Sequence, residues 1–142
     1  MTPYTFRRTD SWREQANHKG GRPARCTLNF RDRYIFFSTQ LAALLGLNAD
    51  AHVAFTYDED KPENIFVRSA DFSDDTQDIQ LCLSTAGRNK SILRCSNRAV
   101  VNHVLTHAGA TKSCTCYVAL KPTRIKGKDH FQILVSCPIT TK

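Results

Sequence analysis

The chain has 142 residues, 41% of them hydrophobic, which is enough to bury one sizeable core and favours a single domain. It has no run of 18 apolar residues and no apolar segment after its first charges, so we expect neither a membrane-spanning helix nor a secretory signal. The net charge of +7 is unevenly distributed along the chain. Residues 1–34 hold eight Lys/Arg and three Asp/Glu, residues 35–87 hold two Lys/Arg and nine Asp/Glu, and residues 88–142 hold ten Lys/Arg and one Asp/Glu. Basic ends and an acidic middle favour a polyanion partner on one side of the protein.

The first 25 residues predict a flexible basic arm. Lys and Arg are spread through polar sequence that contains Gly and Pro, and no helical or strand period persists there. Such an arm can follow phosphates, although a terminus without any partner has the same composition. We therefore expect the arm at residues 1–25 and the folded domain at residues 26–142.

The stretch 26–69 predicts a β-β-α-β-β unit. Its strands are rich in aromatic and β-branched residues, and its helix has an apolar i, i+3, i+4 stripe. Ser38 or Thr39 can cap this helix, and Gly46 can end it because glycine adopts the left-handed conformation at no steric cost. We expect strands at Cys26–Phe30, Tyr34–Phe37, Val53–Tyr57 and Ile65–Arg68, the helical stripe at Leu41, Leu44 and Leu45, and an acidic turn at 58–63.

The stretch 79–136 repeats this order of elements at low identity. Ser96 or Asn97 can cap a second helix, about one turn longer than the first, and Gly109 can end it. The basic stretch 121–130 is predicted as a loop, and Pro138 as the end of the last strand. We expect strands at Ile79–Ser84, Ile92–Cys95, Cys114–Leu120 and Phe131–Val135, and the helical stripe at Val100, Val101, Val104, Leu105 and Ala108.

Strands joined by such short loops should pair antiparallel, and neither half has enough apolar surface to fold alone. The sequence therefore predicts an α+β, mostly β fold. Two β-β-α-β-β units, duplicated within one chain, would form a curved antiparallel sheet or barrel with two helices. Coincidental repetition of the same elements is the alternative.

The stretch Tyr34–Phe55 runs as strand, Ser, short helix, Leu45-Gly46-Leu47, polar turn and Val53-x-Phe55. It resembles the swapped-hairpin unit of the AbrB/SpoVT family, whose β-β-α-β-β chains interlock as dimers, so tandem copies would imply a single-chain pseudo-dimer. The family consists mostly of bacterial DNA-binding regulators and antitoxins. The resemblance implies DNA contacts by Arg31 and Arg33, although Arg31-Asp32-Arg33 and Ser38-Thr39 replace the usual Gly-rich turn and Pro.

The order from Val53 to Ala108, four strands and then a helix, is similar to that of Whirly-type single-stranded DNA-binding domains. This second resemblance implies a curved strand surface for unpaired bases and helices in an oligomer core. Both resemblances imply a DNA partner, and they leave duplex and single-stranded DNA open.

Basic clusters are the candidate phosphate contacts. A basic turn with Arg88 and Lys90 feeds the strand that bears Arg94, and Arg98 opens the helix that follows, whose N-terminus adds partial positive charge. The stretch around Gly127 can close over a nucleic-acid backbone. The first cluster could instead be a solvated basic edge that discourages strand addition. The stretch around Gly127 could instead serve only to keep the protein soluble. Phe36, Phe37 and Tyr117 can stack on bases unless they belong to the core. The candidate residues are Arg31, Arg33, Arg88, Lys90, Arg94, Arg98, Lys121, Arg124, Lys126 and Lys128.

No cofactor, metal site or catalytic group is expected. His103 and His107 lie four apart on the second helix, but its apolar stripe turns them away from the core, and the face of Cys114 and Cys116 should be buried. All of Cys82, Cys95, Cys114 and Cys116 lie within predicted strands, where cysteine commonly serves as a small apolar residue. Six cysteines without a pairing framework favour the cytoplasm.

The sequence predicts a non-enzymatic DNA-binding protein, either a bacterial or phage transcriptional regulator or a single-stranded DNA-binding protein, with a homo-oligomer compatible with either role. The alternative is an interaction or assembly module without a nucleic-acid role. In that case the acidic residues 58–78 would dock a basic partner, and the basic end of the chain an acidic one.

Overall fold

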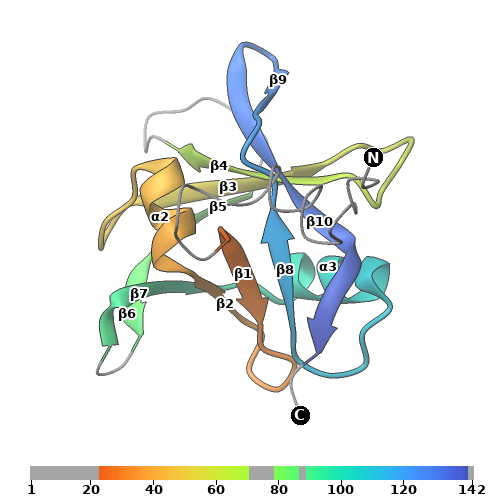
Figure 1. The fold of residues 1–142 in the computed structure, drawn as a ribbon, viewed down its shortest axis with the longest axis horizontal. Helices are drawn as coiled ribbons and strands as arrows, with labels where there is room; N and C mark the ends of the chain where they lie inside the picture. The colour runs from red at the N-terminus through yellow and green to blue at the C-terminus, as the bar shows by residue number, and fades with distance from the viewer. Residues whose placement is uncertain (1–22, 71–78, 87–88, 141–142) are drawn as a thin grey trace, which may run out of the picture.

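The computed structural model describes residues 23–70, 79–86 and 89–140 (Figure 1). Strands predominate in these ranges and two helices accompany them, so the predicted α+β, mostly β class is confirmed. Most of the predicted arm, residues 1–22, lies outside the described residues. Ala24 is fully buried and Arg25 already belongs to the first strand, so the folded part begins slightly before residue 26.

The first half keeps the predicted order of elements. Ser38 caps the helix, because its Oγ accepts a hydrogen bond from the Leu41 amide at 3.1 Å. Gly46 ends the helix in the left-handed conformation with φ 68°, as predicted. The elements are β1 (Arg25–Leu28), β2 (Tyr34–Phe37), α2 (Thr39–Leu45), β3 (His52–Tyr57) and β4 (Ile65–Ala70).

The second half follows the same order with a longer helix. Asn97 caps it by accepting from the Val100 amide at 2.9 Å, and Gly109 ends it with φ 68°. The helix has 11 residues against 7 in the first half, which is the predicted extra turn. The elements are β5 (Ile79–Cys82), β6 (Ser84–Ala86), β7 (Asn89–Ser96), α3 (Arg98–Ala108), β8 (Cys114–Val118), β9 (Thr123–Ile125) and β10 (Lys128–Thr140).

Two predictions about the C-terminal stretch were wrong. Most of the stretch 121–130 is not a loop, because β9 and the start of β10 pair from Thr123 to His130 as a hairpin, and only residues 121 and 122 precede it. The charged residues of this hairpin show none of the apolar alternation that marks a half-buried strand. Pro138 does not end the last strand either. The register with β8 shifts between Leu134 and Ile139, so Pro138 lies in a bulge where its missing N–H costs no ladder hydrogen bond.

One antiparallel sheet contains all the described strands, in the order β5-β3-β4-β10-β8-β1-β2-β7-β6, with β9 attached to β10. Its two terminal strands, β5 and β6, are separated in sequence by Leu83 alone. The Leu83 amide donates to the Ala51 carbonyl at 2.8 Å, and the Leu83 carbonyl accepts from the Asp50 amide at 3.0 Å. The chain itself therefore joins the two ends of the sheet, which is curved and nearly closed.

The strand pairing is symmetric between the two halves, except that the β9–β10 pair has no counterpart in the first half. In this comparison β5 and β6 together take the place of β1. β1–β2 then corresponds to β6–β7, β3–β4 to β8–β10, and β1–β8 to β5–β3. The pairs β2–β7 and β4–β10 each correspond to themselves. The topology is thus that of the predicted duplication, and because the first strand of each half pairs with the other half, the halves interlock.

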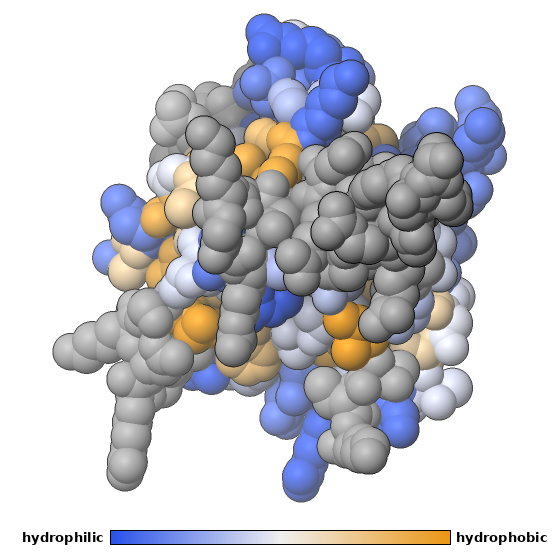
Figure 2. Space-filling model, viewed as in Figure 1, coloured by the Kyte–Doolittle hydropathy of each residue, from blue (hydrophilic) through white to orange (hydrophobic). Residues whose placement is uncertain are grey.

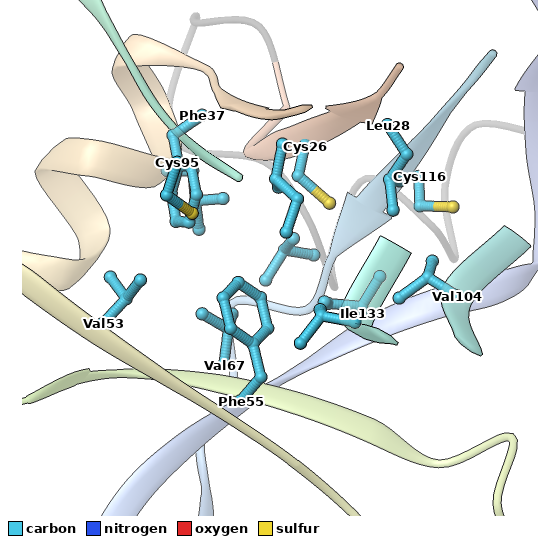
Figure 3. Close-up of a cluster of buried hydrophobic side chains, with 14 of the residues drawn as sticks. Cys26, Leu28, Phe37, Val53, Phe55, Val67, Cys95, Val104, Cys116 and Ile133 are labelled. Carbon is cyan, nitrogen blue, oxygen red and sulfur yellow. The ribbon is translucent and has the colours of Figure 1, made fainter. Parts of the chain in front are cut away.

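The core fills the inside of this curved sheet. Figure 3 shows Phe37, Phe55, Val67 and Ile133 pointing from four different strands into one common interior. Both helices bury their apolar residues in the same cluster, with Leu41 of α2 and Val101 and Val104 of α3 almost completely covered, among others. The two described helices therefore pack against the interior, and neither of them covers the outside of the sheet.

Across the described ranges, neither helix is long and apolar enough to cross a membrane.

Candidate nucleic-acid interface

The outer face is formed by the outward-pointing side chains of β8, β1, β2 and β7. In β2 the residues alternate, so that Ile35 and Phe37 are buried while Tyr34 and Phe36 remain partly exposed. The strand registers carry one outward row across five neighbouring strands. This row consists of Thr115, Thr27, Phe36, Arg94 and Ser84, on β8, β1, β2, β7 and β6 respectively.

Aromatic rings and a guanidinium group meet in the middle of the outer face. The Arg94 guanidinium carbon lies 4.6 Å from the centroid of the Tyr34 ring, and the Tyr34 and Phe36 rings are 5.9 Å apart. Arg94 and Phe36 are also direct cross-strand partners. A cation at this distance from a ring is attracted by the ring quadrupole, so the Arg94 guanidinium group is held against the Tyr34 ring.

The β1–β2 turn adds a second pair of the same kind. The guanidinium carbon of Arg33 lies 4.5 Å from the centroid of the Phe30 ring, and Phe30 is 40% exposed. Asn29 fixes the turn, since its Oδ1 accepts from the Asp32 amide at 2.6 Å and its carbonyl from the Arg33 amide at 3.0 Å. Ser113 Oγ accepts from the Phe30 amide at 2.8 Å and ties the turn to the loop before β8.

We call these two pairs and Phe36 the aromatic–arginine strip: Tyr34, Phe36 and Arg94 on the outer face, and Phe30 and Arg33 in the β1–β2 turn at its end. The Nε atoms of Arg33 and Arg94 are covered and have no hydrogen-bond partner among the described residues. Neither guanidinium pairs with a carboxylate in that part of the chain, whereas Arg124 is ion-paired with Asp129 at 2.9 Å. Two guanidinium groups that are held against rings, with no carboxylate partner among the described residues, can donate to phosphate oxygens.

The structure gathers only some of the predicted basic residues. Arg31 is exposed in the same turn as Arg33, and Arg98 is exposed at the start of α3. Lys90 belongs to β7 by its backbone, and Arg88 lies outside the described residues.

The remaining four basic candidates are remote from the strip. They lie on the β9–β10 hairpin and the segment leading into it, which project from the end of the molecule opposite the β1–β2 turn (Figure 1). Figure 2 shows this projection as a hydrophilic cap at the top of the same view. The two sets of basic residues therefore lie at opposite ends of the molecule (Figure 1). The four residues are Lys121, Arg124, Lys126 and Lys128.

Sequence reasoning missed the ring partners of the arginines. Of the three predicted stacking residues, Phe36 and Tyr117 do point outward, but Phe37 is only 1% exposed and belongs to the core. The alternation of Tyr34-Ile35-Phe36-Phe37 contained the signal, because Ile35 fixes the buried face and assigns Tyr34 to the other one. Arg25, placed in the arm by its composition, is instead the cross-strand partner of Tyr117.

A separate cavity of about 410 Å³ lies between β3, β5 and α3. In it the Tyr57 ring stacks on His103 at 4.2 Å, and His103 Nε2 is 2.8 Å from the Pro62 carbonyl oxygen. His107 follows at 4.5 Å between ring centroids. Over residues 23–70, 79–86 and 89–140, no three metal-ligating side chains come together.

Buried cysteines act as small apolar residues in the core. Cys95, Cys114 and Cys116 are buried as predicted, and so is Cys26. Cys82 is exposed on β5, at one end of the sheet order, so it does not serve as a core residue. Desolvation by burial raises the pKa of Cys26 and Cys95 from 9.0 to about 12, which keeps both thiols protonated and unreactive at neutral pH.

These two thiols should make the fold less stable in alkali. In the unfolded chain a thiol ionises near pH 9.0, whereas Cys26 and Cys95 stay neutral up to about 12, so their contribution is complete below pH 9 and is lost as the pH rises towards 12. Between roughly pH 8 and pH 10, the unfolding free energy should therefore fall by about 1.4 kcal/mol for each of the two thiols.

Urea unfolding at both pH values measures this loss. Cys95→Ala should reduce the pH dependence by the share of one thiol. Thr106→Ala, an exposed change that removes no thiol, should leave it unaltered. An identical pH dependence in Cys95→Ala and the parent would contradict the assignment.

The chain matches no protein-family model, and no curated protein or solved structure shows significant similarity to it. The AbrB/SpoVT and Whirly-type resemblances therefore stay predictions, and the functional argument depends on the outer face itself.

Proposed function

We propose that this is a non-enzymatic DNA-binding protein that holds nucleic acid against its outer face. The observation that carries the proposal is the pair of guanidinium groups, Arg33 and Arg94, lying on aromatic rings without a carboxylate partner in the described part of the chain. The ring fixes the direction of such an arginine, and no neighbouring carboxylate of the described residues neutralises its charge. Both properties favour the binding of a phosphate over a role as an ordinary solvated surface residue.

The distribution of charge supports the same surface. β1, β2 and β7 come from the basic segments 1–34 and 88–142 or border them, whereas the acidic turn 58–63 belongs to the β3–β4 hairpin. Phosphate would be attracted to one side and repelled from another. A regulator or a single-stranded DNA-binding protein of a bacterium or phage, working in the cytoplasm, would have this arrangement, as a monomer or a homo-oligomer.

Salt titration tests the proposal. Fluorescently labelled duplex and single-stranded oligonucleotides are titrated with protein at several salt concentrations. The logarithm of the association constant should fall linearly with the logarithm of salt, with a slope of about −0.9 per phosphate contact for duplex and about −0.7 for single strands. Absence of binding to both forms at about 50 mM salt would overturn the proposal.

A second candidate function is self-assembly through oppositely charged hairpins. The β3–β4 turn exposes Asp58, Glu59, Asp60 and Glu63, and the hairpin at the equivalent place in the other half exposes Lys121, Arg124 and Lys126. Docking of one on the other between copies would be a heterologous contact that forms rings or filaments. Sedimentation of nuclease-treated protein at low and high salt distinguishes this function: a salt-sensitive oligomer free of nucleic acid supports it.

A further inference from the structure

We propose that the ligand of the outer face is a single strand, with unpaired bases stacked on the aromatic–arginine strip. This inference rests on the proposed function and adds the form of nucleic acid and the side chains that recognise it. Three observations support it: the exposure of the rings, the shape of the surface that bears them, and the polar groups that border it.

The rings are available from outside. Phe30 is 40% exposed, and Tyr34 and Phe36 are partly exposed on the outward side of β2. Every base has a π-face, so such rings bind unpaired bases with little sequence preference. The guanidinium planes over Phe30 and Tyr34 extend the same platform, because bases also stack on arginine planes while the charge contacts the backbone.

The shape of the surface disfavours a duplex. The major groove of B-DNA admits a helix or a projecting two-stranded ribbon. β2 is paired on both sides, with β1 and β7, so the middle of the strip lies within a continuous sheet that cannot enter a groove. The β9–β10 hairpin has the form of a ribbon, but it projects from the opposite end and its Arg124 is already paired with Asp129 (Figure 1).

Small hydroxyl side chains border the strip along the sheet, and the single carboxylate of the β1–β2 turn is that of Asp32. Thr27 and Thr115 continue the outward row on one side of Phe36 and share a hydrogen bond of 2.9 Å. Ser84 continues it beyond Arg94, and Ser96 lies opposite Tyr34. Hydroxyl groups both donate and accept, so they can contact phosphates and base edges without repelling either.

Removal of single rings tests the inference. Phe30→Leu and Phe36→Leu keep every charge, so each should weaken binding of an oligo-dT strand about 5- to 150-fold while leaving the salt slope unchanged. Tyr57→Leu is the matched control, because Tyr57 is 48% exposed on β3, outside the strip, and its loss should not alter the affinity. The parent protein should bind oligo-dT more tightly than a duplex of the same length.

The possible outcomes distinguish the base-stacking inference from the proposed DNA-binding function. If both ring variants bind oligo-dT like the parent while Arg33→Gln with Arg94→Gln loses binding, the stacking inference is overturned and the proposed function stands. If the parent prefers duplex, the inference is also overturned. If the parent binds neither form, both fail. Should Phe36→Leu lose thermal stability, Phe30→Leu decides, since Phe30 lies in a turn and contributes little to the core.

Discussion

Replacing Arg33 and Arg94 together with glutamine should weaken nucleic-acid binding about 100-fold or more. Hydrogen bonds to charged groups contribute about 1.5 to 3 kcal/mol each, and both guanidinium groups lack a protein counter-ion among the described residues. The salt slope should become shallower by up to about two units if each group contacts one phosphate. Fluorescence anisotropy with labelled oligonucleotides at several salt concentrations measures both quantities.

The position of the lost charges, and not their number, should determine this effect. Lys121→Gln with Lys126→Gln removes the same charge from the opposite end of the molecule, where both side chains are exposed, and should cost far less affinity (Figure 1). Asp58→Ala with Asp60→Ala should leave binding unchanged or slightly tighter, because it removes repulsion from the acidic turn. Equal losses from all three pairs, at unchanged thermal stability, would contradict a binding surface confined to the outer face.

Leu41→Ala should cost about 2 to 5 kcal/mol of unfolding free energy, the usual range for a leucine removed from a packed core. Leu41 is completely buried and belongs to the cluster that both halves of the chain build. Val104→Ala, in the helix of the other half, should also destabilise the whole protein and not its own half alone. Urea unfolding followed by far-UV circular dichroism and by hydrogen exchange measures both effects.

The interlocked halves should unfold in one step. Thr106→Ala, an exposed change on α3, should alter the unfolding free energy by less than about 0.5 kcal/mol and serves as the control. If Leu41→Ala instead produced a populated intermediate in which β7 and α3 stay protected from exchange, the halves would be independent and the shared core would be wrong.

Local signals made much of the fold predictable. Ser38, Asn97, Gly46 and Gly109 act through hydrogen bonds and backbone angles within a few residues, so the ends of both helices could be read directly from sequence. The β9–β10 hairpin could not, because its exposed strands need no apolar alternation. The junction at Leu83 is also invisible in sequence, since the alternation of residues 79–84 reads as one uninterrupted strand.

The candidate site was predictable only in part. The positions of Arg31 and Arg33 in a hairpin turn followed from local sequence, but Arg94 becomes a neighbour of Tyr34 and Phe36 only through the register of β2 with β7. That register is set by two strands more than fifty residues apart in sequence. Net charge likewise grouped Lys126 with Arg94, and only the folded chain separates them (Figure 1).

The exchange of strands between the halves also constrains how the protein reaches its native state. Thr27 and its cross-strand partner Thr115 are 88 residues apart, so β1 has to wait for nearly the whole remaining chain to be synthesised before β8 can pair with it. Contacts of such high sequence separation slow folding, because the entropy of loop closure is lost before the pairing compensates for it. On the ribosome the N-terminal half would emerge first with β1 unpaired on that side, in a period when chaperones could protect it.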